Sequence, residues 1–294
     1  MWYKYMTSLF IRTPILLTFS LYFLLSGSCV PLSSQTLKCG YLYEYTKQEG
    51  RNLFLKDYCL CIEVDGEYFT CYSENQYLRD SIGMVVLTET NSIYEAQEQQ
   101  NRYPRGENWI IFGQPAIGTF REIQSFAYVY LEGIGEYVQP NWEISTKTEE
   151  ICGYTCQTAT ADYLGRIWTI WFTEEIPVNL GPWLLWGAPG LILKAEDDQG
   201  LFRFTCETIM QTQTGRRMAL ERKLTEAKLN PITKYYTYGL DEMEPLWAKM
   251  TRNLTVADEM MGGHTTIYDS TGKPKDVKSF PYIPLIPDEY WENL

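Results

Sequence analysis

Apolar and polar residues alternate over most of the chain with the period of two that is typical of β-strands. In residues 41–45, for example, three tyrosines at every second position alternate with Leu42 and Glu44. The same reasoning predicts strands over residues 59–64, 67–73, 84–88, 109–112, 126–131, 141–146, 154–163, 167–173, 191–196 and 202–209. Gly-rich or polar turns separate most of these segments, which favours antiparallel pairing.

The predicted fold is therefore mainly β. We expect one large curved antiparallel sheet, or an open barrel-like meander, with one or two short helices; a two-layer β-sandwich is the alternative. One helix is predicted at residues 92–100, where Ser92 is a cap, and one at 241–253, whose apolar stripe suits core packing. Residues 216–228 are compatible with a helix or a long hairpin.

A strong hairpin signal, Asp65-Gly66, lies between two predicted strands that carry cysteines. A two-residue loop puts Cys71 on the side away from Cys61. A three-residue loop instead puts the two cysteines opposite each other, close enough for a disulfide. Both registers remain open from the sequence.

The N-terminus has the pattern of an export signal. Lys4 and Arg12 precede an almost wholly apolar stretch at 14–25, which is shorter than a membrane span. The small residues 26–28 then precede Cys29, which fits a permissive lipobox, so Cys29 is a candidate for lipidation. Ordinary cleavage after the small residues and an uncleaved anchor are the alternatives.

Three segments are expected: a signal peptide at 1–28, a β-rich domain at 29–261 and an extended tail at 262–294. The tail contains several prolines and is expected to lie over the sheet or to trail the domain. Without Cys29, seven cysteines remain, which permits up to three disulfides of unknown pairing in an oxidising compartment.

Composition excludes several functions. The chain of 294 residues carries 25 basic and 37 acidic side chains, a net charge of -12, which disfavours nucleic-acid binding. The single histidine, His264, excludes multi-histidine metal sites, and the cysteine spacings match no zinc pattern, so neither a metal nor a cofactor is expected. No nucleophile, phosphate-binding or dinucleotide motif is present. An enzymatic function is therefore not favoured.

Residues 142–210 closely resemble the GLPGLI family of exported bacterial proteins. The family pattern of Gly-Tyr-x-Cys-x-x-Ala falls on residues 153–159, and its Gly-Arg and Trp on Gly165, Arg166 and Trp168. A Thr-x-Glu-Ile-Pro step and a Gly-Pro follow, and then the naming motif, with Ala188 in place of leucine, on Gly187, Ala188, Pro189, Gly190, Leu191 and Ile192. The resemblance implies an exported, β-rich protein, and no activity or catalytic residue transfers with it.

The motif has two physical interpretations. In the first, residues 174–190 form a loop that crosses between neighbouring strands and plugs one end of the sheet. In the second, the loop is a ligand-binding lip, in which Trp183 and Trp186 supply aromatic faces and Arg166, Glu174 and Glu175 supply nearby charges for a sugar or a peptide.

The expected function is that of an exported, non-enzymatic envelope protein, in the periplasm, at the outer membrane or secreted. It is expected to bind a protein, a peptide or a glycan, and to contact a membrane only through a lipid at Cys29. A carboxylate-based hydrolase is one alternative, which requires two carboxylates converging in a cleft. A purely structural lipoprotein is the other.

Overall fold

The computed structural model describes residues 35–46, 54–126, 129–262, 273 and 283–293. The predicted signal peptide, Cys29 and His264 lie outside these residues. The described part contains twelve strands in a single sheet: β1 (Thr36–Thr46), β2 (Phe54–Asp65), β3 (Tyr68–Ser73), β4 (Trp109–Gln114), β5 (Thr119–Phe126), β6 (Val129–Glu136), β7 (Glu143–Ile151), β8 (Tyr154–Tyr163), β9 (Arg166–Thr173), β10 (Leu191–Asp197), β11 (Phe202–Thr212) and β12 (Lys234–Gly239).

The sheet consists of two antiparallel meanders joined along one strand pair. Strands β1 to β6 form the first and β7 to β11 the second, and β1 pairs with β11 between them, so the order is β12-β6-β5-β4-β3-β2-β1-β11-β10-β9-β8-β7. Only β12 departs from this scheme among the described strands, because it pairs with β6 in parallel. The prediction of a mainly β, open antiparallel sheet is confirmed, and the sandwich alternative is not formed.

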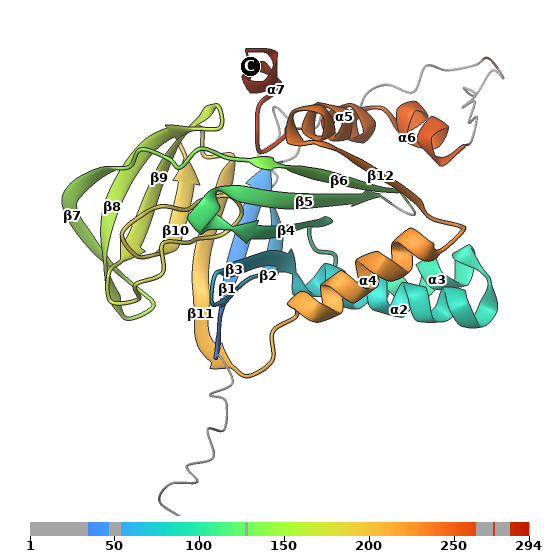
Figure 1. Cartoon of the computed structure of the whole chain (residues 1–294), viewed down its shortest axis with the longest axis horizontal. Coiled ribbons are helices and arrows are strands. Elements are labelled where there is room, and N and C mark those ends of the chain that lie inside the picture. The colour runs from blue at the N-terminus through green and yellow to red at the C-terminus, as the bar shows by residue number, and fades with distance from the viewer. Residues whose placement is uncertain (1–34, 47–53, 127–128, 263–272, 274–282, 294) are drawn as a thin grey trace, which may run out of the picture. The chain divides into compact units, whose positions relative to one another are not determined.

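Six α-helices lie in the described residues, more than the one or two that the pattern predicts: α2 (Glu74–Thr90), α3 (Ile93–Gln100), α4 (Arg217–Leu229), α5 (Leu240–Arg252), α6 (Leu254–Met261) and α7 (Asp288–Glu292). A short 3-10 turn, η1 (Pro115–Ile117), links β4 to β5. Figure 1 shows α2, α3 and α4 grouped together near β2 and β3, whereas α5 lies along β6 and β12. No helix of the described residues is long and apolar enough to span a bilayer.

Both predicted helices are present. In α3, the Ser92 hydroxyl accepts a hydrogen bond from the Glu95 amide, which is the expected N-cap. In α5, Met243, Trp247 and Met250 of the apolar stripe are buried, as expected for core packing. Residues 216–228, which the pattern left open, form helix α4.

Two strand predictions are wrong. Residues 84–88 lie in α2, where Arg79, Gly83 and Leu87 are buried at intervals of four, the period of a helix. The short apolar run at Met84–Leu87 mimics a strand because such runs do not distinguish the two periods. Residues 126–131 do not form one strand either, since Phe126, the last residue of β5, pairs with Val129, the first residue of β6.

The β2–β3 hairpin has neither of the two registers considered above. Asp65 pairs with Tyr68, so the two-residue loop is Gly66-Glu67 rather than Asp65-Gly66. Cys71 then opposes Ile62, and Cys61 opposes Tyr72. The two cysteines belong to different hydrophobic clusters on opposite faces of the sheet, which excludes a bond between them. All seven described cysteines are free thiols.

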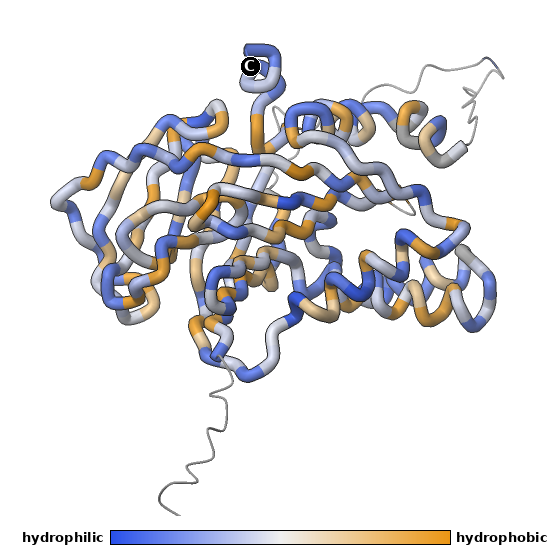
Figure 2. Tube along the Cα trace, viewed as in Figure 1, coloured by the Kyte–Doolittle hydropathy of each residue, from blue (hydrophilic) through white to orange (hydrophobic). Residues whose placement is uncertain are grey.

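The half of the sheet built from β2 to β6 is covered on both faces. Leu220 and Leu224 of α4 pack on Tyr72 and Ile123 on one face. The other face carries the larger cluster, to which α5 and the loop between β9 and β10 contribute. Figure 2 shows hydrophobic and hydrophilic residues interspersed along these strands and helices, as expected of elements that each bury one face.

A pair of carboxyl groups from β5 and α5 lies buried where α5 packs on the sheet. Glu122 of β5 is 2% exposed and Glu244 of α5 is 8% exposed. Burial raises the pKa of both groups, and the charge of Glu244 adds to the effect on Glu122. The pKa of Glu244 rises from 4.5 to about 7. The pair is therefore protonated in the folded protein under conditions in which an unfolded glutamate is charged.

We expect this pair to make the protein less stable as the pH rises. The folded protein retains the Glu244 proton up to about pH 7, whereas the unfolded chain releases it near 4.5, so the free energy of unfolding falls between these values. The loss is on the order of 3 kcal/mol. Urea denaturation at pH 5 and pH 8 measures it. Because burial raises the pKa of both groups, the double variant Glu122→Gln/Glu244→Gln should remove most of this pH dependence, whereas the exposed control Glu174→Gln should retain it. Equal slopes in the double variant and the control would contradict the prediction.

Candidate functional site

The motif loop, residues 174–190, folds back over the concave face of the sheet and packs against it. Within it, the Gly187 amide donates to Asn179 O at 2.8 Å, and the amide of Ile192 donates to Leu180 O at 2.9 Å, so the loop forms an irregular hairpin. Its tip, Trp183–Trp186, is buried with every side chain at most 5% exposed. The loop is therefore a plug, as the first of the two interpretations predicts.

The glycines of the motif serve this packing. A Cβ atom on Gly190 would lie 1.9 Å from the carbonyl oxygen of Thr173, so only glycine permits the two backbones to approach this closely. Gly187 has a φ of +82°, the left-handed conformation. Ala188 is 1% exposed, Pro189 is exposed, and Leu191 and Ile192 are fully buried at the start of β10. The small Ala188 side chain thus lies in the core rather than at a surface.

The two predicted binding tryptophans are core residues in the structure. Trp183 is 2% exposed and lies 5.6 Å from Trp168 between ring centroids, and Trp186 is 5% exposed and lies 5.7 Å from Phe120. The Trp142 indole nitrogen donates to the carbonyl of Trp186 at 2.7 Å. A ligand role for Trp183 and Trp186 stays a prediction, and their burial favours packing.

The structure does not bring the predicted charged residues together. Arg166 begins β9, whereas Glu174 and Glu175 follow its end, so the strand separates them by about 23 Å. Both glutamates are exposed, and Glu175 accepts a hydrogen bond from the Thr155 amide at 3.2 Å. Arg166 and the two glutamates therefore cannot contact one small ligand simultaneously.

Arg166 is buried and fully engaged. Its guanidinium donates to Asp197 at 3.1 Å and to the carbonyl oxygens of Pro284 and Leu285 at 2.8 and 2.7 Å. It also lies 4.6 Å from the centre of the Phe202 ring. Burial lowers the pKa of Arg166, while the Asp197 charge opposes that shift. Arg166 thus attaches the C-terminal segment to the sheet.

A pocket of about 660 Å³ lies beside this attachment. Three segments that are distant in the sequence line it: the β6–β7 connection, the β8–β9 turn and the C-terminal segment with α7. The lining residues are Val138, Gln139, Pro140, Asn141, Asp162, Tyr163, Leu164, Gly165, Pro287, Glu289, Tyr290 and Asn293. The volume is within the range that small-molecule sites occupy.

The chemistry of the lining is acidic, amide-rich and aromatic. Asp162 and Glu289 supply carboxylates, and Gln139, Asn141 and Asn293 supply amides. Tyr163 and Tyr290 supply phenol rings. No lysine or arginine lines the pocket. Such a lining offers many hydrogen-bond acceptors and donors together with ring faces, and it repels anions.

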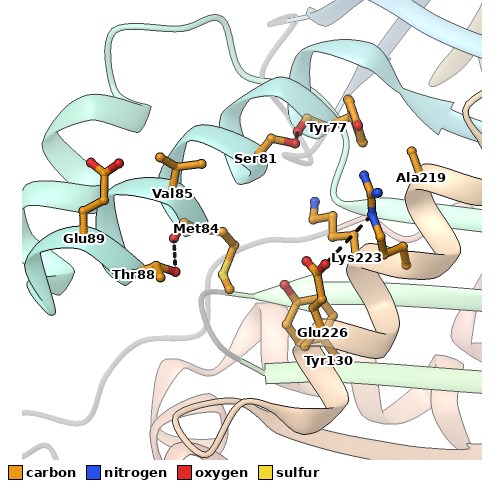
Figure 3. Close-up of a pocket in the computed structure, with 12 residues that line it drawn as sticks. Tyr77, Ser81, Met84, Val85, Thr88, Glu89, Tyr130, Ala219, Lys223 and Glu226 are labelled. Carbon is orange, nitrogen blue, oxygen red and sulfur yellow. Dashed lines mark hydrogen bonds and ion pairs between the residues drawn. The ribbon is translucent and has the colours of Figure 1, made fainter.

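A second, smaller groove of about 460 Å³ lies between α2 and α4 (Figure 3). Tyr77 and Met84 of α2 face Lys223 of α4 across it. The Lys223 ammonium forms an ion pair of 2.6 Å with Asp80, which ties the two helices together. The groove is a junction between helices, and none of the motif residues reaches it.

Neither pocket contains the buried carboxyl pair, Glu122 and Glu244. A carboxylate-based hydrolase requires a carboxyl group with a raised pKa in a cleft. Glu122 and Glu244 have raised pKa values, but the core encloses both side chains. The described residues also contain no group of three or more His, Cys, Asp or Glu side chains that could hold a metal ion.

Sequence reasoning identified the Gly165-Arg166 turn, of which Gly165 lines the pocket, but it did not predict a pocket there. The pocket exists because Arg166 brings residues 283–287 against the Gly165 turn; a Cβ atom on Gly165 would lie 3.1 Å from Pro287. No local pattern marks Val138–Asn141 or α7 as partners of this turn. The tail residues that the structure describes do contact the domain.

Comparison with known proteins agrees with the sequence pattern over a short stretch. The family described as a protein of unknown function (Porph_ging), which is the GLPGLI family, matches residues 165–194. This match covers the β8–β9 turn, β9, the plug and the start of β10. A search of curated proteins finds no match.

Among solved structures, similarity is found to PNGF-II in two crystal forms. The P21 form aligns with a TM-score of 0.44 at 12% identity over 69% of this chain, and the C2 form with 0.47 at 12% over 79%. The chain spans about a third of the length of these structures, 32% and 34%. A likeness at this level defines no function.

We expect substitution of Arg166 to detach the C-terminal segment. Arg166→Met leaves buried Asp197 without its counter-charge and two carbonyl groups without their donor, which should lower the free energy of unfolding by about 3 kcal/mol. Hydrogen exchange of residues 283–293 should accelerate in the native state. Arg203→Met is the matched control, because that half-exposed arginine pairs with Glu196 at the surface. This substitution should lower the free energy of unfolding by less than about 1 kcal/mol. Unchanged exchange at residues 283–293 would refute the anchoring role.

Proposed function

We propose that the protein is an exported envelope protein that binds a neutral, hydroxyl-rich ligand, a glycan, in the pocket between the β8–β9 turn and α7. The observation that carries this proposal is the lining of that pocket: two carboxylates, three amides and two tyrosines, without a basic residue. Carboxylates and amides pair with sugar hydroxyl groups, and ring faces pack against the apolar faces of sugars. The negative charge of the chain, -12, agrees with an uncharged ligand.

The site lies on a rigid support. The Leu164-Gly165 turn has positive φ at both residues and joins two strands of the sheet, and Arg166 fixes the opposite wall. Tyr290 packs edge-on against Trp291 at 5.1 Å between ring centroids, which orients its ring. A preorganised wall of this kind reduces the entropy lost on binding.

Export is supported by the N-terminal pattern of Lys4, Arg12 and the apolar stretch at 14–25, and by the resemblance to an exported family. A carboxylate-based hydrolase would use the same pocket, because Asp162 and Glu289 both line it. A structural lipoprotein would leave the pocket empty.

A glycan array tests the binding function. The mature protein should bind neutral oligosaccharides and reject sulfated or uronic-acid polymers. For the best oligosaccharide, calorimetry should show at least a tenfold loss of affinity for Tyr290→Ala and for Asp162→Asn, about 1.4 kcal/mol or more. Arg222→Ala, in the α2–α4 groove, is the matched control and should bind normally. Absence of any neutral glycan ligand, or wild-type affinity in Tyr290→Ala, rejects the proposal; cleavage of the bound oligosaccharide would favour the hydrolase.

We further propose that Cys29 carries a lipid. Metabolic labelling with a palmitate analogue should label the wild-type chain, and Cys29→Ser should lose both the label and its membrane fractionation. Cys59→Ser serves as the control, because this cysteine lies within the folded domain and should leave labelling unchanged. An unlabelled wild-type protein would instead indicate ordinary cleavage after residues 26–28.

A further inference from the structure

Cys152 occupies the tip of the β7–β8 hairpin in an unusual conformation. Ile151 pairs with Tyr154, so Cys152 and Gly153 form a two-residue turn, and both have positive φ, 52° and 80°. Asn, Asp or Gly is preferred at the first position of such a turn, because other side chains are strained there. A cysteine at this place therefore needs a reason beyond the turn itself.

The hairpin tip reaches a second cysteine on a distant strand. The Cys152 thiol donates to the carbonyl oxygen of Cys206 in β11 at 2.9 Å. The two thiol groups also interact with each other: burial, and after it the thiols of Cys39 and Cys152, raises the pKa of Cys206. Strand β11 is three positions from β8 in the sheet, so the tip bends over the sheet to make this contact.

Cys39, Cys71 and Cys61 are less suitable partners. Cys39 also lies near Cys206, but it is fully buried, and burial raises its pKa to about 12. Cys71 is fully buried as well, and Cys61 lies on the opposite face of the sheet. Cys152 is exposed and can react with an external oxidant, while Cys206 lies directly beneath it at 3% exposure.

We propose that Cys152 and Cys206 form a disulfide bond during maturation in an oxidising compartment. The oxidant is a disulfide-bonded donor of that compartment. The Cys152 thiol loses its proton and attacks one donor sulfur, and the other donor sulfur leaves and is protonated. The Cys206 thiol then loses its proton and attacks the Cys152 sulfur, which releases the second donor thiol. Two electrons and two protons pass to the donor, which becomes a dithiol.

The bond would fix the curvature of the sheet. It closes a loop between residues 54 positions apart and ties the hairpin of the edge strand β7 to β11. Strand β7 pairs with β8 alone, and its residues are mostly exposed, so this strand has little other support. The Cys152 thiol at its tip already contacts the backbone of Cys206, so we expect closure to require side-chain rotation rather than a rearrangement of the strands.

Oxidative refolding with glutathione and its disulfide, followed by peptide mapping without reduction, tests the bond independently of export and of glycan binding. The expected product is a Cys152–Cys206 peptide pair lighter by two hydrogens. Reduction should lower the melting temperature of the oxidised wild-type protein by on the order of 5 °C. Reduction should leave the melting temperature of the Cys152→Asn variant unchanged.

Cys152→Asn is the informative variant because asparagine suits the left-handed turn, so loss of the thiol is not confounded by misfolding. Cys59→Ser is the control and should form the bond as the wild type does. Alkylation of both Cys152 and Cys206 as free thiols after oxidation overturns the proposal. A linkage of Cys206 to Cys39 overturns it as well.

Discussion

The packing of the plug into the concave face of the sheet is the interaction on which the other features depend. A twelve-stranded sheet that curves leaves an apolar face that must be covered. Here a loop from the sheet itself covers it: Trp183 packs on Trp168 in the second meander, and Trp186 packs on Phe120 in the first. The phenol of Tyr41 in β1 donates to the carbonyl of Ile192 just after the loop, at 2.7 Å. One segment therefore joins both meanders through a shared core.

This arrangement explains why the recognisable motif is a folding element. A Gly/Pro-framed loop with two tryptophans has the composition of a binding surface, but each glycine is needed here for a close approach or a left-handed turn inside the protein. Large aromatic side chains bury much apolar area, and the same property serves a ligand or a core. The sequence pattern cannot distinguish the two, because the distinction depends on which strands lie around the loop.

Local patterns nevertheless predicted much of the architecture. Strands such as β8 and β11 and the Ser92-capped helix follow from alternation, turn residues and a capping hydroxyl, which act over a few residues. The failures involve tertiary context. Residues 84–88 belong to helix α2, which buries its own Arg79 and Leu87 on one face. The β2–β3 register differs because the turn lies one residue later than the Asp65-Gly66 signal indicates. The pocket was not predictable, because its walls come from segments distant in the sequence, which Arg166 and the contact of Gly165 with Pro287 bring together.

Two segments at the edges of the plug are attached to the sheet by different chemistry: the C-terminal segment near the start of β9, and the β7–β8 hairpin. At the start of β9, buried Arg166 satisfies Asp197 and two carbonyl groups of the C-terminal segment, an ionic attachment that also builds the pocket wall. On the β7–β8 side, the contact between Cys152 and the backbone of Cys206 adds to the pairing of β8 with β9. An ion pair forms in any compartment, whereas a thiol pair is completed only under oxidising conditions. The attachment beside the proposed ligand site is therefore formed by folding alone, and oxidation adds rigidity at the other attachment without altering that site.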